Sequence, residues 1–446
     1  MKTTSTYLIP ALALLFLAAG PGTALAQDPP VGPPAQRRHP TYTLLGRDAD
    51  LVAPDSVLNP NFVVSTASRM AEGSLWRSGY IPERMVGLDV GDVDGDGKNE
   101  LAYATLRNVY LYRLEGETYT QLATFKMPDN ARSVALDVFD VDGNGRREII
   151  VTAQNDSTHA ANTQILSYDG TKDLKLLAGG INYYLRVIGP ENGRALVAQK
   201  PGTAGGEMFS GPVYYASLSG GKISTAGKLD LPFNVNIFNF NIGEIGLERM
   251  RLTSSIRFPT EHLILTETTG EKVWESHDEY GGSINHLNLY AYGDAAKNVE
   301  YLPTRIILAD IDKDGANELI VAKNSMGGTR LFKNLRSFNA GAIEARKFTN
   351  LSLVPFFTNT NLMPGPAVDY MLADFDNNGS KDLVVGILIE PGSGMMEEAR
   401  SIIFAFNNLY TVEPAPLPGQ PVSGPQQGTQ PGQPSPGPQS AQAPPR

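Results

Sequence analysis

One nine-residue acidic pattern occurs four times in this chain and constrains its fold more than any other feature. The pattern is Asp-x-Asp-x-(Asp/Asn)-Gly-x-x-(Glu/Asp), and an apolar run precedes and follows each copy. The copies lie within residues 86–104, 134–152, 306–322 and 370–386. Their first Asp residues are 48, 170 and 64 residues apart, so the long interval has room for two further units. A recurring unit of this size is typical of a solenoid, a propeller or another repeat array.

The apolar runs of these units indicate β-strands, because they are short, rich in β-branched and aromatic residues, and bounded by Gly, Asp and Asn. The long interval holds two degenerate units. Residues 184–199 keep both apolar runs and Gly193 without the acids, and a second unit begins near Val235 and ends near Ser276. Six units of four short strands predict an all-β fold, a β-propeller of six four-stranded blades, with seven blades as the alternative number. A linear β-array and two sandwiches are the competing architectures.

The two tryptophans predict how such a ring closes. Trp76 precedes the first unit and Trp274 ends the fourth, and both have the sequence context of an outer strand. The last unit shows only three strands, and the Pro-rich sequence after Leu409 lacks the donors that a fourth would need. We therefore expect residues near 75–78 to pair with the blade that contains Asp374, which closes the ring without an open edge.

The acidic pattern has the chemistry of a calcium site. Carboxylates this close repel one another unless a cation lies among them, and Ca²⁺ prefers six to eight hard oxygen ligands. Positions 1, 3, 5 and 9 offer side-chain oxygens, position 7 offers its backbone carbonyl, and the Gly at position 6 allows a sharp turn. The four copies predict about four calcium ions, one per loop, and none at the degenerate unit around Gly193. The predicted ligands are Asp92, Asp94, Asp96, Lys98, Glu100, Asp140, Asp142, Asn144, Arg146, Glu148, Asp310, Asp312, Asp314, Ala316, Glu318, Asp374, Asp376, Asn378, Ser380 and Asp382.

An EF-hand and a metal-free turn are the alternatives to this interpretation. An EF-hand needs a bidentate Glu at position 12 and flanking helices. Position 12 is instead a residue of a predicted strand in every copy: Tyr103, Val151, Val321 and Val385. Acid-rich hairpin turns without metal would explain one loop well, but they explain four equally spaced copies poorly.

The four loops resemble the calcium-binding repeats called FG-GAP or VCBS repeats, as found in the N-terminal propeller of integrin α-subunits. The resemblance is strong in the loops, weak in the two degenerate units and absent from both ends of the chain. It implies a propeller with Ca²⁺ held in hairpin loops between the strands of a blade. Integrin propellers have seven blades, whereas six units are found here. The family acts in adhesion, in ligand binding and beside enzymes, so the resemblance specifies the metal better than the function.

The ends of the chain differ in composition from the repeats. Residues 1–26 have the features of a secretory signal peptide, with Lys2, an apolar stretch over 8–19 and a small-residue cleavage site before Gln27. A membrane anchor is the alternative there. Residues 27–40 are a Pro-rich leader, 41–412 the predicted propeller, and 413–446 a Pro-, Gln- and Gly-rich tail that we expect to be disordered. We expect an exported protein, periplasmic, at the cell surface or extracellular, without a transmembrane segment after signal cleavage.

Composition and motifs bear on function mainly by exclusion. The chain has no cysteine, which excludes thiol nucleophiles, and its formal net charge of -10 argues against a nucleic-acid partner. Neither a nucleophile elbow nor a zinc-protease or phosphate-binding motif occurs. We therefore expect a non-catalytic module that binds a protein or polysaccharide. A cell-envelope carbohydrate-active enzyme and a structural part of a surface assembly are the alternatives. Four tyrosines are candidates for a sugar-binding patch or for ordinary strand positions: Tyr183, Tyr184, Tyr214 and Tyr215.

Overall fold

The computed structural model describes residues 75–406, except 117, 172, 204–206, 290–298, 327–335, 392–398 and the side chains of 75 and 357–362. The predicted signal peptide, the leader and the tail lie outside these residues, and the bounds 41 and 412 stay predictions. Within the described part, no helix is long and apolar enough to cross a membrane.

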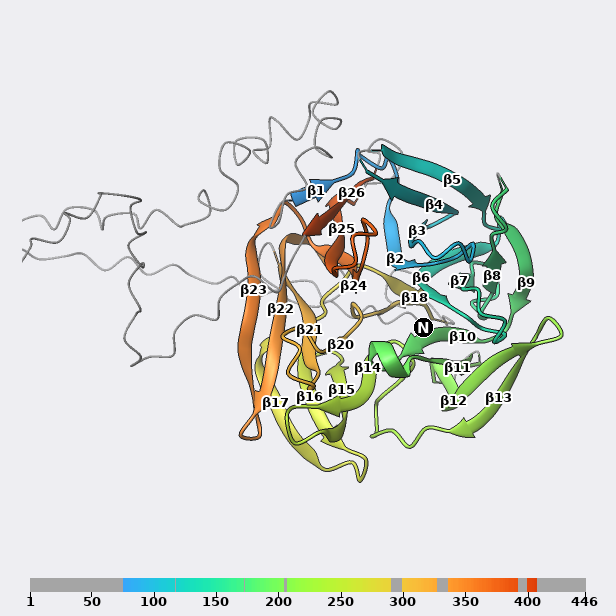
Figure 1. Cartoon of the computed structure of the whole chain (residues 1–446). Helices are drawn as coiled ribbons and strands as arrows, with labels where there is room; N and C mark the ends of the chain where they lie inside the picture. The colour runs from blue at the N-terminus through green and yellow to red at the C-terminus, as the bar shows by residue number, and fades with distance from the viewer. Residues whose placement is uncertain are drawn as a thin grey trace, which may run out of the picture. The chain divides into compact units, whose positions relative to one another are not determined.

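The described strands form six four-stranded antiparallel sheets, arranged as blades around a common axis (Figure 1). We name the blades A to F in chain order, and the first strand of each lies nearest the axis. Blade A has β2 (Met85–Gly91), β3 (Glu100–Thr105), β4 (Asn108–Glu115) and β5 (Thr118–Lys126). Blade B has β6 (Ala131–Phe139), β7 (Glu148–Asn155), β8 (Thr163–Ser167) and β9 (Lys175–Ile181). Blade C has β10 (Tyr184–Ile188), the 3₁₀ turn η4 (Glu191–Gly193), β11 (Ala195–Pro201), β12 (Phe209–Ser219) and β13 (Lys222–Lys228).

The second half of the ring repeats this order. Blade D has β14 (Phe240–Ile245), β15 (Met250–Arg257), β16 (His262–Glu267) and β17 (Lys272–Glu279). Blade E has β20 (Ile307–Ala309), β21 (Glu318–Met326), β22 (Phe338–Thr349) and β23 (Ser352–Met363). Blade F has β24 (Ala367–Ala373), β25 (Asp382–Glu390), β26 (Arg400–Phe406) and β1 (Leu75–Arg77). The prediction of an all-β propeller is confirmed, with six blades in the described residues. The two degenerate units are blades C and D.

Burial falls from the axis to the rim of a blade. Every residue of β2 is buried, β4 alternates between buried and half-buried residues, and β5 is mostly exposed. The inner strands lie between neighbouring blades, so apolar side chains on both of their faces leave water. One apolar cluster, which includes Leu111, Leu136 and Val151, joins blade A to blade B in this way. Burial of the apolar runs therefore stabilises the ring at each blade-to-blade contact.

The ring closes as the sequence predicts. β1 pairs antiparallel with β26, with Trp76 opposite Ala405, so the N-terminal strand completes the last blade. The Trp76 side chain is buried, and its ring centroid lies 4.9 Å from those of both Tyr119 and Phe375. These two contacts join blades A and F across the seam. Trp274 lies in β17, the outermost strand of blade D, so the shared outer-strand position of the two tryptophans is confirmed.

One connection departs from the repeat and crosses the axis. Between blades D and E the chain forms a hairpin of β18 (His286–Asn288) and β19 (Val299–Tyr301). The Asn285 side-chain amide donates to the Val86 carbonyl at 2.9 Å, and Gln154 donates to the Asn288 carbonyl at 2.8 Å. Val86 lies near the start of β2, so the hairpin binds blades A and B at the end of the ring opposite the β2–β3 loop. The sequence patterns did not predict this hairpin.

Candidate metal centres

The four acidic patterns form equivalent loops between the first and second strands of their blades. Loop A is residues 92–100, loop B is 140–148, loop E is 310–318 and loop F is 374–382. Because each follows the innermost strand, all four lie at the same end of the ring. Position 12 of each pattern falls in β3, β7, β21 or β25, so the exclusion of an EF-hand is confirmed.

The loops share one hydrogen-bonding scheme. The Asp at position 1 accepts from the backbone N–H of the Gly at position 6, at 2.9 Å for Asp92 and Gly97 and at 3.0 Å for Asp374 and Gly379. The acid at position 9 accepts from the N–H of position 2, at 2.8–3.1 Å in all four loops. The Gly at position 6 has φ between 87° and 90° in every loop, a conformation that favours glycine. The pattern thus specifies one turn that directs its acids inward.

Acidic oxygens converge in each loop. Carboxylate oxygens of three acids lie within 4.8 Å of one another in every case: Asp92, Asp94 and Asp96; Asp140, Asp142 and Glu148; Asp310, Asp312 and Glu318; Asp374, Asp376 and Asp382. Positions 1 and 3 belong to all four groups, and position 9 belongs to three. The structure therefore brings together most of the acids that the sequence selects. The predicted ligands outside these groups are the side chains of Glu100, Asn144, Asp314 and Asn378 and the carbonyls of Lys98, Arg146, Ala316 and Ser380. The role of every predicted residue as a metal ligand stays a prediction.

Buried oxygens in loops E and F fit a bound cation. Asp310 Oδ1, Glu318 Oε1 and Asp382 Oδ1 are buried and have no hydrogen-bond partner. A buried carboxylate oxygen without a partner is costly unless a cation or donor satisfies it. Burial also raises the pKa of the acid at position 9 to about 7 in each loop: Glu100, Glu148, Glu318 and Asp382. Ionised carboxylates and a carbonyl are the oxygen ligands that hard divalent cations prefer, so these residues fit calcium.

A basic side chain from the third strand enters two of the loops. In blade A, Arg113 of β4 lies 2.9 Å from Asp94 and 2.8 Å from Asp96, and it also binds Glu100. In blade E, Lys347 of β22 lies 2.6 Å from Asp312 and also binds Asp314. Tyr112 pairs with Leu101, and Arg346 pairs with Leu319. Arg113 and Lys347 are the next residues along their strands, so they lie beside the acids at position 9, Glu100 and Glu318. The corresponding residue in blade B is neutral, Ser167. Two loops thus carry a cation of their own.

The predicted tyrosine patch does not form one surface. Tyr184 is 1% exposed and packs in the core with Phe238, whereas Tyr215 is 38% exposed on β12. Tyr183 lies in the bend before β10 and is half-buried, whereas Tyr184 is the first residue of β10 and is buried. Tyr184 therefore has an ordinary core position, which is the alternative that the sequence offered for these residues. Tyrosines do stack in blade A, where the Tyr112 and Tyr119 ring centroids are 4.4 Å apart.

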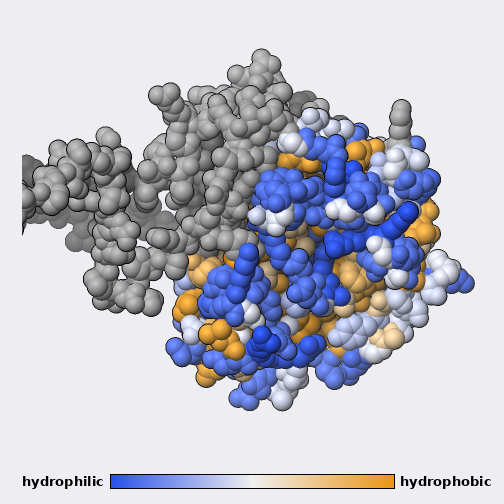
Figure 2. Space-filling model, viewed as in Figure 1, coloured by the Kyte–Doolittle hydropathy of each residue, from blue (hydrophilic) through white to orange (hydrophobic). Residues whose placement is uncertain are grey.

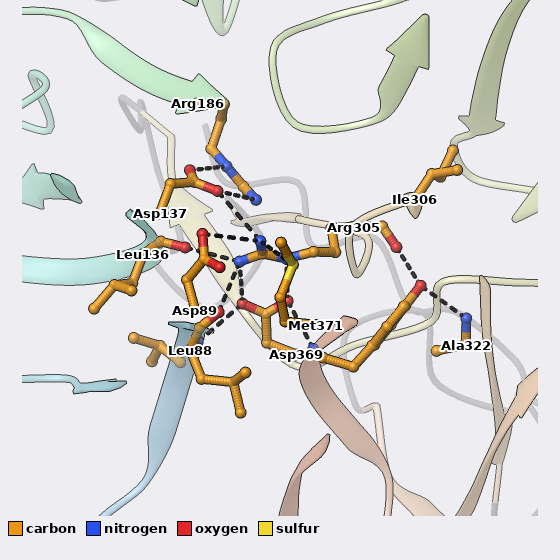
Figure 3. A network of polar contacts seen from close by, with 12 residues as sticks. Leu88, Asp89, Leu136, Asp137, Arg186, Arg305, Ile306, Ala322, Asp369 and Met371 are labelled. Carbon is orange, nitrogen blue, oxygen red and sulfur yellow. Dashed lines mark hydrogen bonds and ion pairs between the residues drawn. The ribbon is translucent and has the colours of Figure 1, made fainter. Parts of the chain in front are cut away.

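A buried charge network lies on the axis behind the loops (Figure 3). Arg305, just before β20, donates through Nε to Asp369 Oδ1 at 2.6 Å. Its Nη2 donates to the carbonyls of Leu88 at 3.0 Å and Leu136 at 2.8 Å. Burial alone would lower the pKa of Arg305, but the surrounding carboxylates outweigh burial and raise it. One guanidinium thus joins blades A, B, E and F.

Two further acids complete this network. Asp137 binds Arg186 at 2.8 Å, and Asp89 binds Arg194 at 2.9 Å, which adds blade C. The Arg305 Nη1 atom lies 3.4 Å from Asp137 and 3.8 Å from Asp89. Sequence reasoning missed these residues. Asp89 and Asp137 each stand three residues before the first acid of a loop, and an acid inside an otherwise apolar strand was the signal that could have found them.

The comparisons with known proteins agree with this architecture. Residues 92–151 match the model of the FG-GAP-like repeat. The chain is a β-propeller with an FG-GAP-like repeat. The match covers loops A and B, and the repeat family that the loop sequences resemble is thereby confirmed. No curated protein matches the chain significantly.

Several solved structures are similar to this chain. The Dos1 propeller is 10% identical, with 72% of this chain and 68% of that chain covered and a TM-score of 0.32. A putative oxidoreductase (glucose dehydrogenase) from Thermus thermophilus is 12% identical, with 71% and 100% covered and a TM-score of 0.35. The PQQ-bound aldose sugar dehydrogenase of Streptomyces coelicolor is 10% identical, with 75% and 99% covered and a TM-score of 0.34. At these values the similarity implies neither a substrate nor a cofactor.

Proposed function

We propose that this protein is an exported, calcium-stabilised, non-catalytic binding module. The observation that carries the proposal is the convergence of three acids in each of the four loops, together with the buried oxygens of Asp310, Glu318 and Asp382 that have no hydrogen-bond partner. Calcium in the loops would hold the end of each inner strand and keep that end of the ring rigid. The ligand would be a protein or a polysaccharide. Export rests on the sequence of residues 1–26 alone.

The carboxylates near the axis support binding over hydrolysis. A glycoside hydrolase needs two carboxyl groups that reach the substrate from opposite sides. Asp89, Asp137 and Asp369 are buried and paired with arginines. None of them lines the cavity that lies on the propeller axis, which we call the axial cavity. Of the acids that do line it, Asp140 and Asp374 belong to loops B and F, where the proposed calcium uses them. A carbohydrate-active enzyme, the alternative from sequence, has no such observation in its favour.

Calcium titration tests the proposal. Equilibrium dialysis of the purified protein should find about four ions per chain at saturation. Asp382→Asn should remove one ion, since it replaces a ligand of loop F. Asp230→Asn is the matched control, because Asp230 is an exposed acid outside the loops that pairs with Lys228 at 3.2 Å. Fewer than two ions per chain, or equal loss in both variants, would contradict the proposal.

A further inference from the structure

A cavity of about 620 Å³ lies on the propeller axis, beside the acidic loops. The first strand of every blade contributes to its wall, for example Val90 of β2, Val138 of β6 and Asn241 of β14. The hairpin of β18 and β19 crosses the opposite end of the ring, so the cavity opens on the loop side. Figure 2 shows the side of the ring seen in Figure 1, where hydrophilic residues dominate and hydrophobic residues are visible between them. The size is that of a site for a small organic ligand.

The charged groups of this cavity are mainly basic. Its wall includes Arg147, Arg186, Arg194, Arg305 and Lys381 against three acids, Asp140, Glu191 and Asp374. Lys381 forms an ion pair with Glu191, and the other two acids are the first residues of loops B and F. When a cation binds in these loops, it offsets the charge of both acids. Because Arg186, Arg194 and Arg305 pair with buried carboxylates, the positive charge that remains at the cavity is that of Arg147.

Two of these arginines are held in place from behind. Asp137 binds Nε and Nη2 of Arg186, and Asp89 binds Nη2 of Arg194 (Figure 3 shows Arg186 and both acids). These carboxylates fix the guanidinium planes, and no described residue hydrogen-bonds Nη1 of either arginine. Because the planes are fixed before binding, a ligand loses less entropy when it pairs with them.

The third arginine has no such anchor. Arg147, in loop B, forms no hydrogen bond or ion pair with another described residue, and it lines the cavity. Its side chain crosses the end of β2 at Gly91, where a Cβ atom would lie 2.7 Å from Nη1. Gly91 therefore leaves the space through which Arg147 reaches the cavity. A guanidinium with five free donors matches the two oxygens of a carboxylate.

We propose that the axial cavity binds a small organic carboxylate, held by Arg147 and by the outward edges of Arg186 and Arg194. This site specifies where the proposed binding module takes a ligand, and it rests on that proposed function. Calcium strengthens the binding, because it offsets Asp140 and Asp374 at the mouth, and the carboxylate in turn strengthens calcium binding. The carboxylate belongs either to a free hydroxy acid or to the acidic end of a sugar chain.

Isothermal titration calorimetry on the full chain tests this site. Sodium L-malate and sodium D-glucuronate represent the two sources, and D-glucose is the neutral control. In calcium, at least one carboxylate should bind saturably and glucose should not. Arg147→Gln should weaken the binding about tenfold or more, which corresponds to about 1.4 kcal/mol. Arg400→Gln is the matched control, because Arg400 of β26 lies outside the cavity wall and the acidic loops and pairs with Glu390 at 3.6 Å, and it should leave the affinity within about twofold.

The outcomes separate this inference from the proposed function when calcium content is measured in the same samples. Binding of malate but not glucuronate identifies a hydroxy acid, and the reverse identifies a sugar acid. If the protein binds calcium but neither carboxylate, the proposed cavity site is wrong, whereas the proposed calcium-binding module is not contradicted. If a carboxylate binds but the protein takes up no calcium, the cavity site is supported and the proposed calcium-stabilised module is wrong. Equal affinity in Arg147→Gln and the intact chain would show that the arginine is not a ligand-binding residue.

Discussion

Replacing Arg113 with Gln should separate the two ways in which an acidic loop is stabilised. Arg113 binds three acids of loop A, and its side chain is 10% exposed while that of Glu100 is fully buried. Removal of one partner from a buried ion pair costs about 3–5 kcal/mol. In chelator, nothing else supplied by β4 offsets the acids of loop A. When no metal is present, the free energy of unfolding of Arg113→Gln should therefore be lower than that of the parent by most of this amount.

The loss can be expressed as a melting temperature. At about 2.1 cal mol⁻¹ K⁻¹ per residue, the roughly 330 residues from Leu75 to Phe406 give an unfolding entropy of about 0.7 kcal mol⁻¹ K⁻¹. The midpoint of Arg113→Gln should then fall by about 4–7 °C in chelator. Calcium at 100 times its Kd stabilises a site by about 2.7 kcal/mol. Without Arg113, loop A has one more uncompensated negative charge and should bind calcium more tightly than the parent loop, so the difference between variant and parent should shrink in calcium.

Thermal unfolding followed by circular dichroism, in chelator and in calcium, measures both values. Lys98→Gln is the matched control, because Lys98 lies in the same loop and pairs with Glu115 at 3.3 Å while both side chains are half exposed. The reciprocal variant Ser167→Arg places a cation beside loop B and should reduce the destabilisation that chelation causes. An equal loss for Arg113→Gln with and without calcium would refute the idea that arginine and metal serve the same acids.

Three other variants test the rest of the ring. Trp76→Ala should cost about 3–5 kcal/mol, because it empties a buried site between Tyr119 and Phe375, and a melt unchanged from the parent would contradict closure through β1. Arg305→Gln should cost at least as much, since it leaves Asp369 buried without its partner, and the double variant with Asp369→Asn should recover part of the loss in urea unfolding. Burial lowers the pKa of His286 below its ordinary value of 6.5. The stability that depends on a neutral His286 is therefore fully present above pH 6.5, and it is lost as the pH falls through the folded-state pKa. His286→Gln should therefore flatten the decline in stability below pH 6.5, and an unchanged decline would exclude His286 as its source.

The sequence predicts the features of this fold that depend on short stretches of chain. A loop acid, its Gly at position 6 and the flanking strands lie within about twenty residues, so each copy specifies its own turn and hairpin. Ring closure was predictable for a different reason. The last blade lacked a strand, Pro excluded the following residues, and Trp76 supplied a strand with no other partner.

Contacts between distant residues were not predictable in this way. Arg305 binds Asp369 from 64 residues away, and it reaches Leu136 from 169 residues away. The place of Arg113 beside Glu100 follows from the register of β3 and β4, which a single sequence does not give. The burial of Tyr184 depends on where β10 begins, since Tyr184 is its first residue and Tyr183 lies in the bend before it.

The basic residues of the third strands make the loops more alike than their sequences are. Loops A and E each have four acids and receive Arg113 or Lys347, whereas loop B has three acids and faces Ser167. When the positive charge of Arg113 or Lys347 is added to the charges of the acids, loops A, B and E each have a net of three negative charges. Loop F also has three acids, with Asn378 at position 5. Equal charge is what sites for the same cation require, because ligand charge sets calcium affinity. An arginine or lysine thus accompanies the two loops that have an additional Asp, whereas loop B, with Asn144 at position 5, faces Ser167.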